Sequence, residues 1–176
     1  ILISGFEPFA DNKINPTMYL VNALCEQSFK FQVYGVILPV SYSKSYQTLE
    51  AEINKYEPDI VISFGLAEKR KSINFEQFAK NIMDTKVPDN EGVVHQNVAI
   101  DPEDKESLTT NLQIVEIKET LRKNNLSSEL STSAGTYVCN QLMYKTLQLS
   151  YKNGFKTGFI HVPSFKKQHS GIFYIA

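Results

Sequence analysis

The chain contains no tryptophan and only two cysteines, eight glycines and seven prolines among its 176 residues. Because Cys25 and Cys139 are its only thiols, a disulfide framework is not expected, and a reducing cytoplasm is the natural location. No apolar run approaches the roughly 20 residues that cross a bilayer, and no charged segment precedes an apolar leader. Eighteen basic residues against nineteen acidic ones leave a net charge of −1, which gives no electrostatic reason to expect nucleic acid or an anionic membrane as a partner.

The composition that remains is that of a globular domain, with 42% hydrophobic and 21% charged residues. A chain of this length buries a sizeable core, and no linker, repeat or low-complexity segment divides it, so a single domain over residues 1–176 is expected. Apolar runs alternate with helical stretches, which predicts an α/β sandwich with parallel strands. The expected strands are residues 1–4, 31–38, 59–64, 73–79, 128–131 and 157–162, and the expected helices are residues 15–27, 43–55, 110–123 and 138–149, with a long loop at 84–107.

Two of these segments carry positional signals. Asn15 and Pro16 are typical of a helix N-cap and the first helical residue after it. Residues 73–79 are expected to form an edge strand whose alternation places Asn74 and Glu76 on one face.

Cys139 follows the small-residue turn Ser133-Ala-Gly-Thr136, which is expected to lead into a helix. A thiol in the first turn of a helix meets unpaired backbone N–H groups and the positive end of the helix dipole, so its pKa is expected below the ordinary value of roughly 8.5. The same N–H groups can receive the oxyanion of a tetrahedral intermediate. Taken alone, Cys139 is equally well interpreted as a buried structural cysteine, and Cys25, in mid-helix among apolar residues, is interpreted as core.

His161 lies at the end of the apolar strand 157–162. In a parallel α/β sheet, reactive groups gather at the carboxyl ends of strands, so His161 is a candidate base, although taken alone it fits a hydrogen-bonded core histidine better. His95 and His169 lie in polar segments and are weaker candidates. Glu76 taken alone is interpreted as a solvated strand carboxylate.

Four segments occur in the order found in a known family: Ser4-Gly-Phe-Glu-Pro-Phe9 with Asn15-Pro16; Gly65-Leu-Ala67 through Glu76 to Val87-Pro-Asp-Asn-Glu-Gly92; Ser133-Ala-Gly-Thr-Tyr-Val-Cys-Asn140; and Gly158-Phe-Ile-His-Val-Pro163. Through them the chain resembles the pyroglutamyl peptidase I (pyrrolidone carboxyl peptidase) family of cysteine peptidases. The third and fourth segments are specific, whereas the segment around Glu76 is looser. Together they extend over nearly the whole chain.

The resemblance implies a Glu–Cys–His triad, which falls on Glu76, Cys139 and His161. It implies a single-domain α/β/α sandwich around a twisted, mostly parallel (mixed) sheet, and a cytoplasmic thiol protease that needs no cofactor or metal and associates as dimers or tetramers. The activity implied is that of an exopeptidase, which hydrolyses the N-terminal pyroglutamyl residue from peptides and proteins through a thioester acyl-enzyme. Because the chain ends soon after His161, the C-terminal helix of the family is expected to be short or missing.

The resemblance also implies a pocket for the five-membered lactam, with contacts expected from Phe6, Phe9, Asn15, Leu66, Val87, Tyr137 and Val138. Phe6 and Phe9 are expected as its walls, and the backbone carbonyl of Leu66 as the acceptor for the lactam N–H. Donors to the oxyanion are expected from the backbone N–H of Cys139 and from the region of Lys86. Lysine stands there where the family commonly has arginine, whose planar fork lysine lacks.

Two other interpretations stay open. Departures from the family pattern at residues 68–77, together with the short C-terminus, allow a catalytically impaired α/β homologue that binds a small ring compound without cleaving it. A serine hydrolase built on Ser131 or Ser133 is the other, although the chain lacks the Gly-x-Ser-x-Gly pattern of such enzymes.

Overall fold

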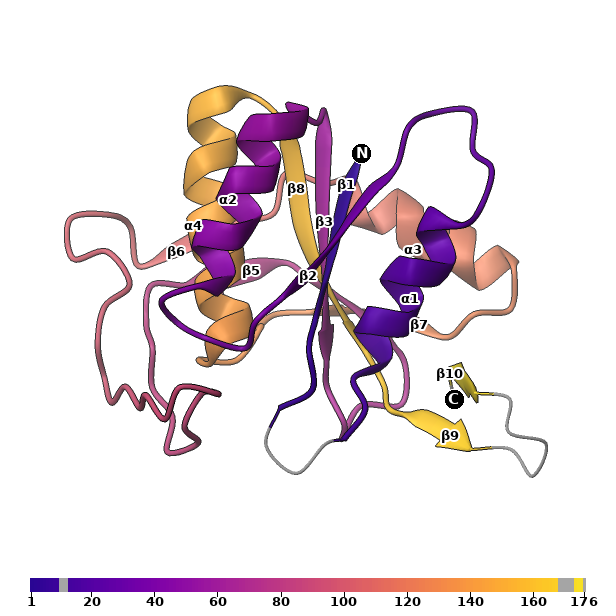
Figure 1. Ribbon diagram of the computed structural model, residues 1–176. Helices are drawn as coiled ribbons and strands as arrows, with labels where there is room; N and C mark the ends of the chain where they lie inside the picture. The colour runs from indigo at the N-terminus through magenta and orange to yellow at the C-terminus, as the bar shows by residue number, and fades with distance from the viewer. Residues whose placement is uncertain (10–12, 168–172, 176) are drawn as a thin grey trace.

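The computed structural model describes residues 1–9, 13–167 and 173–175 (Figure 1). Its centre is a six-stranded sheet in the order β2-β1-β3-β8-β4-β7. The pairs β1–β2, β1–β3, β3–β8 and β4–β7 are parallel, and β4–β8 is antiparallel. The bounds are β1 (Leu2–Phe6), β2 (Tyr34–Leu38), β3 (Ile60–Leu66), β4 (Ile73–Glu76), β7 (Ser128–Ser131) and β8 (Lys156–Val162).

Four helices cover the two faces of this sheet, so the molecule has three layers (Figure 1). One face carries α1 (Pro16–Cys25) and α3 (Ile114–Lys123), and the other carries α2 (Ser45–Tyr56) and α4 (Val138–Asn153). The expected α/β/α sandwich around a mixed, mostly parallel sheet is therefore confirmed. Among the described helices, none is both long enough and apolar enough to cross a bilayer.

Two short two-stranded sheets lie outside the main sheet. β5 (Phe78–Lys80) pairs with β6 (Ser107–Thr109), and β9 (Phe165–Lys167) pairs with β10 (Phe173–Ile175). The chain therefore continues in strands beyond Pro163, where the sequence predicted the last strand to stop.

The sheet has an apolar core on each side. Leu2, Leu142 and Phe159 belong to the cluster that includes the α4 side chains, whereas Val21 and Phe75 belong to the cluster that includes the α1 side chains; all five are at most 2% exposed. Burial of both faces explains why the central strands are apolar runs rather than alternating ones. Packing on both faces thus fixes the positions of the carboxyl ends of β3 and β8.

The predicted start of α1 is confirmed. The Asn15 side chain accepts a hydrogen bond from the Thr17 backbone N–H at 3.1 Å, and Pro16 is the first helical residue. This is the favoured chemistry of a helix N-terminus, because the cap satisfies a backbone donor and proline lacks one.

Cys25, predicted to lie in the core, is exposed. It is the last residue of α1, and its sulfur lies against Gly35 of the edge strand β2, where an added Cβ would be 2.5 Å from it. Because α1 ends at the edge of the sheet, Cys25 is exposed although its neighbours in the helix are apolar.

The strand at 73–79 is also not the edge strand that the sequence predicted. It ends at Glu76, and β4 lies between β8 and β7, with Asn74 opposite His161 in the antiparallel pair. Side chains two positions apart on neighbouring strands share a face and come within reach diagonally, so Glu76 and His161 can meet.

Candidate active site

The carboxyl ends of β3 and β8 lie side by side, with Gly65 opposite His161 in the parallel register. α4 begins at Val138, so Cys139 is its second residue. The Cys139 sulfur lies close to the Gly65 backbone, because a Cβ added at Gly65 would be 3.1 Å from it and 2.7 Å from the Phe159 ring. Glycine at position 65 therefore gives the sulfur its room beside the end of β3.

The thiol of Cys139 is not the low-pKa group that the sequence predicted. Burial and, to a smaller extent, the charge of Glu76 raise its pKa to about 12, although the Cys139 backbone N–H and the Arg70 charge oppose the rise. Although part of Cys139 is open to a cavity, loss of water around the sulfur outweighs the N–H groups at the helix start. The resting residue is therefore a thiol that needs a base to become a nucleophile.

His161 supplies an imidazole at the same cavity. Its Nδ1 lies 2.7 Å from Oε1 of Glu76, and the two residues are 5% and 0% exposed. Because the carboxylate accepts from Nδ1–H, this contact favours the tautomer whose Nε2 has a free lone pair. A thiol and a ring nitrogen able to accept its proton thus share one cavity.

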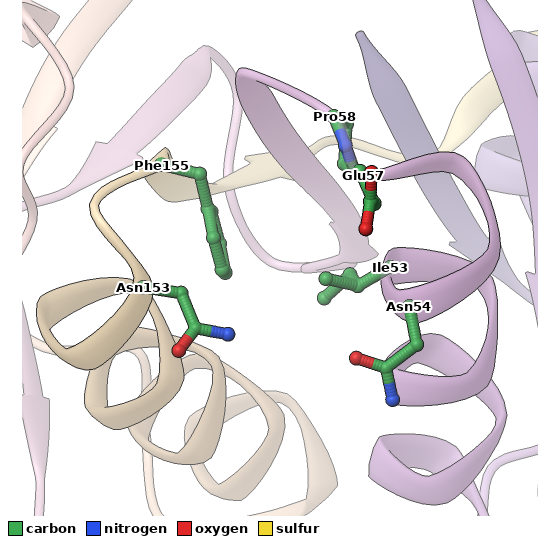
Figure 2. Close-up of a pocket in the computed structure, with 6 residues that line it drawn as sticks. All are labelled: Ile53, Asn54, Glu57, Pro58, Asn153 and Phe155. Atoms are coloured by element: carbon green, nitrogen blue, oxygen red, sulfur yellow. The ribbon is translucent and has the colours of Figure 1, made fainter.

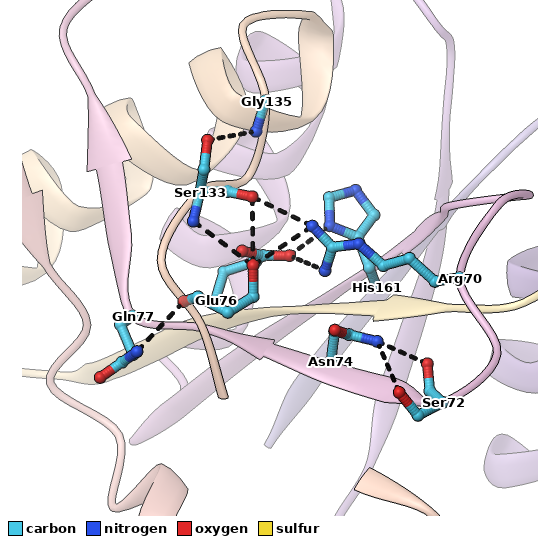
Figure 3. A network of polar contacts seen from close by, with 9 residues as sticks. Arg70, Ser72, Asn74, Glu76, Gln77, Ser133, Gly135 and His161 are labelled. Atoms are coloured by element: carbon cyan, nitrogen blue, oxygen red, sulfur yellow. Dashed lines mark hydrogen bonds and ion pairs between the residues drawn. The ribbon is translucent and has the colours of Figure 1, made fainter. Parts of the chain in front are cut away.

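Arg70 completes a polar network around Glu76 (Figure 3). Its Nη1 donates to Oε1 of Glu76 at 2.5 Å, and its Nη2 donates to the Ser131 hydroxyl at 3.2 Å and to the Ser133 carbonyl at 3.0 Å. Sequence reasoning assigned Arg70 no role, although it is one of only two arginines among the eighteen basic residues. The scarcity of arginine in the sequence is the one local feature that could have pointed to Arg70.

The cavity that Cys139 and His161 line encloses about 130 Å³. Clefts for drug-sized ligands measure roughly 300–1,000 Å³, so this one suits only a small group. Its lining is mostly apolar and consists of Phe6, Phe9, Asn15, Val40, Leu66, Ala134, Tyr137, Val138, Cys139 and His161.

The structure brings most of the predicted pocket residues to this cavity, but not all of them. Val87 and Lys86 are exposed and do not line it, whereas Val40 and Ala134 line it without having been predicted. The Asn15 amide, expected near the substrate, also binds its own surroundings, because its Nδ2 donates to the Glu7 carbonyl at 3.0 Å.

Other clefts lie away from these groups. One, of about 300 Å³, opens between the carboxyl ends of α2 and α4, with Ile53 and Phe155 pointing into it and Asn54 and Asn153 at its rim (Figure 2). It lies at the opposite end of the sheet, because Phe155 precedes β8 whereas His161 is near its end.

A second cleft is an apolar groove of about 580 Å³ against the α1 and α3 face, lined by side chains such as Leu24, Phe75 and Leu121. Neither cleft has a cysteine or histidine in its lining.

An α/β/α sandwich that gathers a thiol and an imidazole at one small cavity, with a buried carboxylate bound to the imidazole, has the parts of a cysteine hydrolase. Comparison with known families is specific: the family model described as pyroglutamyl peptidase matches residues 1–172. The chain belongs to the pyroglutamyl peptidase family, a family of cysteine peptidases.

Named relatives and solved structures agree. The pyrrolidone-carboxylate peptidase of Pyrococcus furiosus is 38% identical over 173 residues, which is 96% of this chain and 82% of the relative. That of Thermosipho africanus is 41% identical over 171 residues, which is 96% of this chain and 83% of the relative. The structure of pyrrolidone carboxyl peptidase from Thermococcus litoralis superposes with a TM-score of 0.91 at 38% identity, covering 95% of this chain and 77% of that chain.

Proposed function

We propose that this member of the pyroglutamyl peptidase family removes N-terminal pyroglutamate from peptides with Cys139 as nucleophile, His161 as base and Glu76 as the group that orients the base. The observation that carries the proposal is the 2.7 Å contact between His161 Nδ1 and Glu76 Oε1 beside a cavity shared with Cys139. It leaves the other ring nitrogen available for the thiol proton.

The reaction begins when Nε2 of His161 takes the proton of the Cys139 thiol and the sulfur attacks the pyroglutamyl carbonyl carbon. The carbonyl oxygen becomes an oxyanion, which the Cys139 backbone N–H at the start of α4 receives. His161 then gives its proton to the departing peptide amine, and the C–N bond breaks to leave a thioester. Water, deprotonated by His161, attacks the thioester and releases free pyroglutamate and the thiol.

The raised thiol pKa shapes this sequence. A sulfur whose pKa is about 12 carries little negative charge at neutral pH before substrate binds. Proton transfer to His161 therefore belongs to the attack itself, and the imidazolium that forms is stabilised by the buried Glu76 carboxylate.

Size and polarity of the cavity account for the choice of substrate. A volume of about 130 Å³ walled by Phe6, Phe9 and Tyr137 suits a small flat ring without charge. An ordinary N-terminus would bring an ammonium group into the same apolar space, where burying an unpaired charge costs several kcal/mol. The Leu66 backbone carbonyl, at the end of β3, is the proposed acceptor for the lactam N–H.

The test is steady-state cleavage of a pyroglutamyl-aminocoumarin substrate with and without iodoacetamide. Cys139→Ala is expected to abolish release of the fluorophore while the fold is kept, and Cys25→Ala, the matched control at the exposed thiol, to retain it. Turnover by Cys139→Ala equal to that of the wild type would exclude Cys139 as the nucleophile. Binding of pyroglutamate without any cleavage would favour the impaired homologue, and inactivation by a fluorophosphonate but not by iodoacetamide would favour a serine hydrolase.

The same proposal extends to location and assembly. Two free thiols, one of them the nucleophile, suit a reducing cytoplasm, and self-association is proposed from the family resemblance. Light scattering coupled to gel filtration tests the assembly, since a single mass near the 20.0 kDa of one chain would contradict it.

A further inference from the structure

The segment between β3 and β4 folds back so that its one arginine reaches the interior. A turn joins the Arg70 backbone N–H to the Ala67 carbonyl at 3.0 Å, directly after β3 ends at Leu66. The Arg70 side chain is 27% exposed, and its partner, the Glu76 side chain, is 0% exposed. The Nη1 and Nη2 edge of the guanidinium thus meets the inside of the protein.

This single guanidinium holds three segments together (Figure 3). Nη1 contacts Glu76 at the end of β4, and Nη2 contacts Ser131 at the end of β7 and Ser133 in the turn that leads to α4. Ser131 is itself fixed to that turn, because its hydroxyl also accepts from the Ser133 backbone N–H at 3.3 Å. The turn is the one that carries the chain into Cys139.

The two carboxylate oxygens of Glu76 differ in their hydrogen bonds. Its Oε1 receives both Arg70 Nη1 at 2.5 Å and His161 Nδ1 at 2.7 Å, whereas Oε2 is buried with no hydrogen-bond partner among the described residues. The guanidinium is therefore the only cation that contacts a fully enclosed carboxylate in the described structure. A buried carboxylate that loses such a partner turns away or takes up a proton.

We propose that Arg70 is a positioning residue of the reaction, which fixes the Glu76 carboxylate behind His161 and ties this pair to the turn that carries Cys139. The inference rests on the proposed function and adds to it a fourth residue that does not line the substrate cavity. Arginine is required because its planar fork donates in two directions at once, which a lysine ammonium on a flexible stem does not reproduce.

The charge of Arg70 also acts on the sulfur. Arg70 lowers the pKa of the Cys139 thiol, opposing burial and the Glu76 charge, which raise it. The other titratable groups facing this thiol are His161 across the cavity and the phenols of Tyr42 and Tyr137. Removing the guanidinium leaves the raising effects unopposed by the nearest cation, so the thiol should ionise at higher pH.

The experiment compares Arg70→Met, Arg70→Lys and Ser131→Ala with the wild type, and uses Arg122→Met as the matched control. Arg122 is an exposed helical arginine whose ion pair with Glu119 lies on the surface. We expect Arg70→Met to lower kcat about 100-fold with little change in KM, which is the effect of misplacing a reacting group by about 1 Å. Arg70→Lys should lie between it and the wild type, Ser131→Ala should show a smaller loss, and Arg122→Met none.

Two readouts separate positioning from a general structural role. The rate at which iodoacetamide alkylates Cys139 should rise at higher pH in Arg70→Met than in the wild type, with Cys25 replaced by alanine in every variant. In the background of Glu76→Gln, Arg70→Met should lower kcat little further, because residues that act through one another are not additive. Should Arg70→Met fail to fold, Arg70→Lys and Ser131→Ala, which keep Glu76 paired with a cation, are expected to show the same order of effects.

Wild-type kcat and an unshifted alkylation profile in Arg70→Met would overturn the inference while leaving the proposed function intact. The inference would also be overturned if Arg70→Met lowered kcat by the same factor in the Glu76→Gln background as in the wild type. If the wild-type chain cleaves no pyroglutamyl substrate, the proposed function fails, and the inference about Arg70 is decided by the alkylation profile, which requires no turnover.

Discussion

Oε1 of Glu76 lies 2.7 Å from Nδ1 of His161, and this contact joins two neighbouring strands that run in opposite directions. His161 comes from the end of β8, and Glu76 from the end of β4, two positions beyond the residue opposite the histidine. Both residues are at most 5% exposed, so the pair is shielded from water. Since the parallel strand β3 lies on the other side of β8, the imidazole lies between the buried carboxylate and the end of β3, where Leu66 lines the small cavity.

Replacing Glu76 by glutamine is expected to lower kcat by about 10²- to 10⁴-fold, with a smaller effect on KM. The amide keeps the volume but loses the charge that stabilises imidazolium, and its NH2 group can favour the wrong ring tautomer. Steady-state kinetics on a pyroglutamyl substrate measures the effect. The matched control is Glu129→Gln, an exposed residue of the neighbouring strand β7, which should retain wild-type kcat. An unchanged rate in Glu76→Gln would remove this residue from the triad.

The raised pKa of Cys139 predicts a loss of stability at alkaline pH. The thiol pKa rises from 9.0 to about 12 on folding, so the native state keeps a proton that the unfolded state releases between these values. The stabilisation is complete below pH 9 and is lost as the pH rises toward 12, at about 1 kcal/mol for each pH unit. Denaturant unfolding of the wild type and of Cys139→Ala from pH 8 to 11 measures it.

In that comparison, the wild type should lose free energy of unfolding faster than Cys139→Ala above pH 9. The tyrosines whose pKa values are raised without any contribution from Cys139, such as Tyr46 and Tyr144, titrate in both proteins and cancel in the difference. Parallel curves would show that the folded thiol ionises as readily as the unfolded one, and would contradict the raised pKa.

The local features of the fold were predictable, because they depend on residues close together in the chain. Asn15 and Pro16 mark the start of α1, and the strand at 128–131 and the start of α4 at Val138 are found at the predicted residues. The alternation around Glu76 correctly placed it on one face with Asn74, but Glu76 is fully buried and not the solvated carboxylate that the local pattern indicated. Periodicity reports which residues share a face, and that information survives whatever strand lies alongside.

What failed depends on neighbours that the local pattern does not contain. Whether residues 73–79 form an edge is decided by the pairing of β7, whose residues are more than fifty positions further along the chain. Cys25 has an apolar helical context, but its burial depends on where α1 ends relative to the rim of the sheet.

The site shows the same division between local and distant causes. The helix start beside Cys139 was predicted, whereas the desolvation that dominates its pKa is caused by packing from several segments, Phe159 and Gly65 among them. Arg70 was missed because two of its partners, Ser131 and Ser133, lie 61 and 63 residues away. The contact between Glu76 and His161 was expected only through the family resemblance, since Glu76 alone carries no local signal.

Substitutions at Asn15 separate its role in the helix from its role beside the cavity. Asn15→Ala should lose about 1 kcal/mol of stability because the cap is removed, whereas Asn15→Ser keeps an oxygen for the Thr17 backbone N–H. Asn15→Ser still lacks the Nδ2 donor that binds the Glu7 carbonyl, two residues before Phe9 of the cavity wall. We therefore expect a wild-type melting temperature but a raised KM in Asn15→Ser. A KM equal to that of the wild type in both variants would show that Asn15 serves the helix alone.

A methyl group at Gly65 is expected to remove activity by displacing the nucleophile. The added Cβ would lie 3.1 Å from the Cys139 sulfur and 2.7 Å from the Phe159 ring, so one of them must move. A shift of about 1 Å at a reacting atom lowers the rate by about 100-fold. We therefore expect kcat to fall by about this factor even at temperatures where the variant is fully folded.

Gly35→Ala is the matched control for this substitution. Its Cβ would lie 2.5 Å from the Cys25 sulfur and 2.8 Å from a Val21 methyl group, which is at least as crowded but on the far face of the sheet at its edge. Overpacking of this kind costs roughly 1–3 kcal/mol, so both variants should melt at lower temperatures than the wild type. Only Gly65→Ala should lose kcat at a temperature where both are folded, and an equal loss in Gly35→Ala would mean that crowding at Gly65 acts through stability rather than through the position of the sulfur.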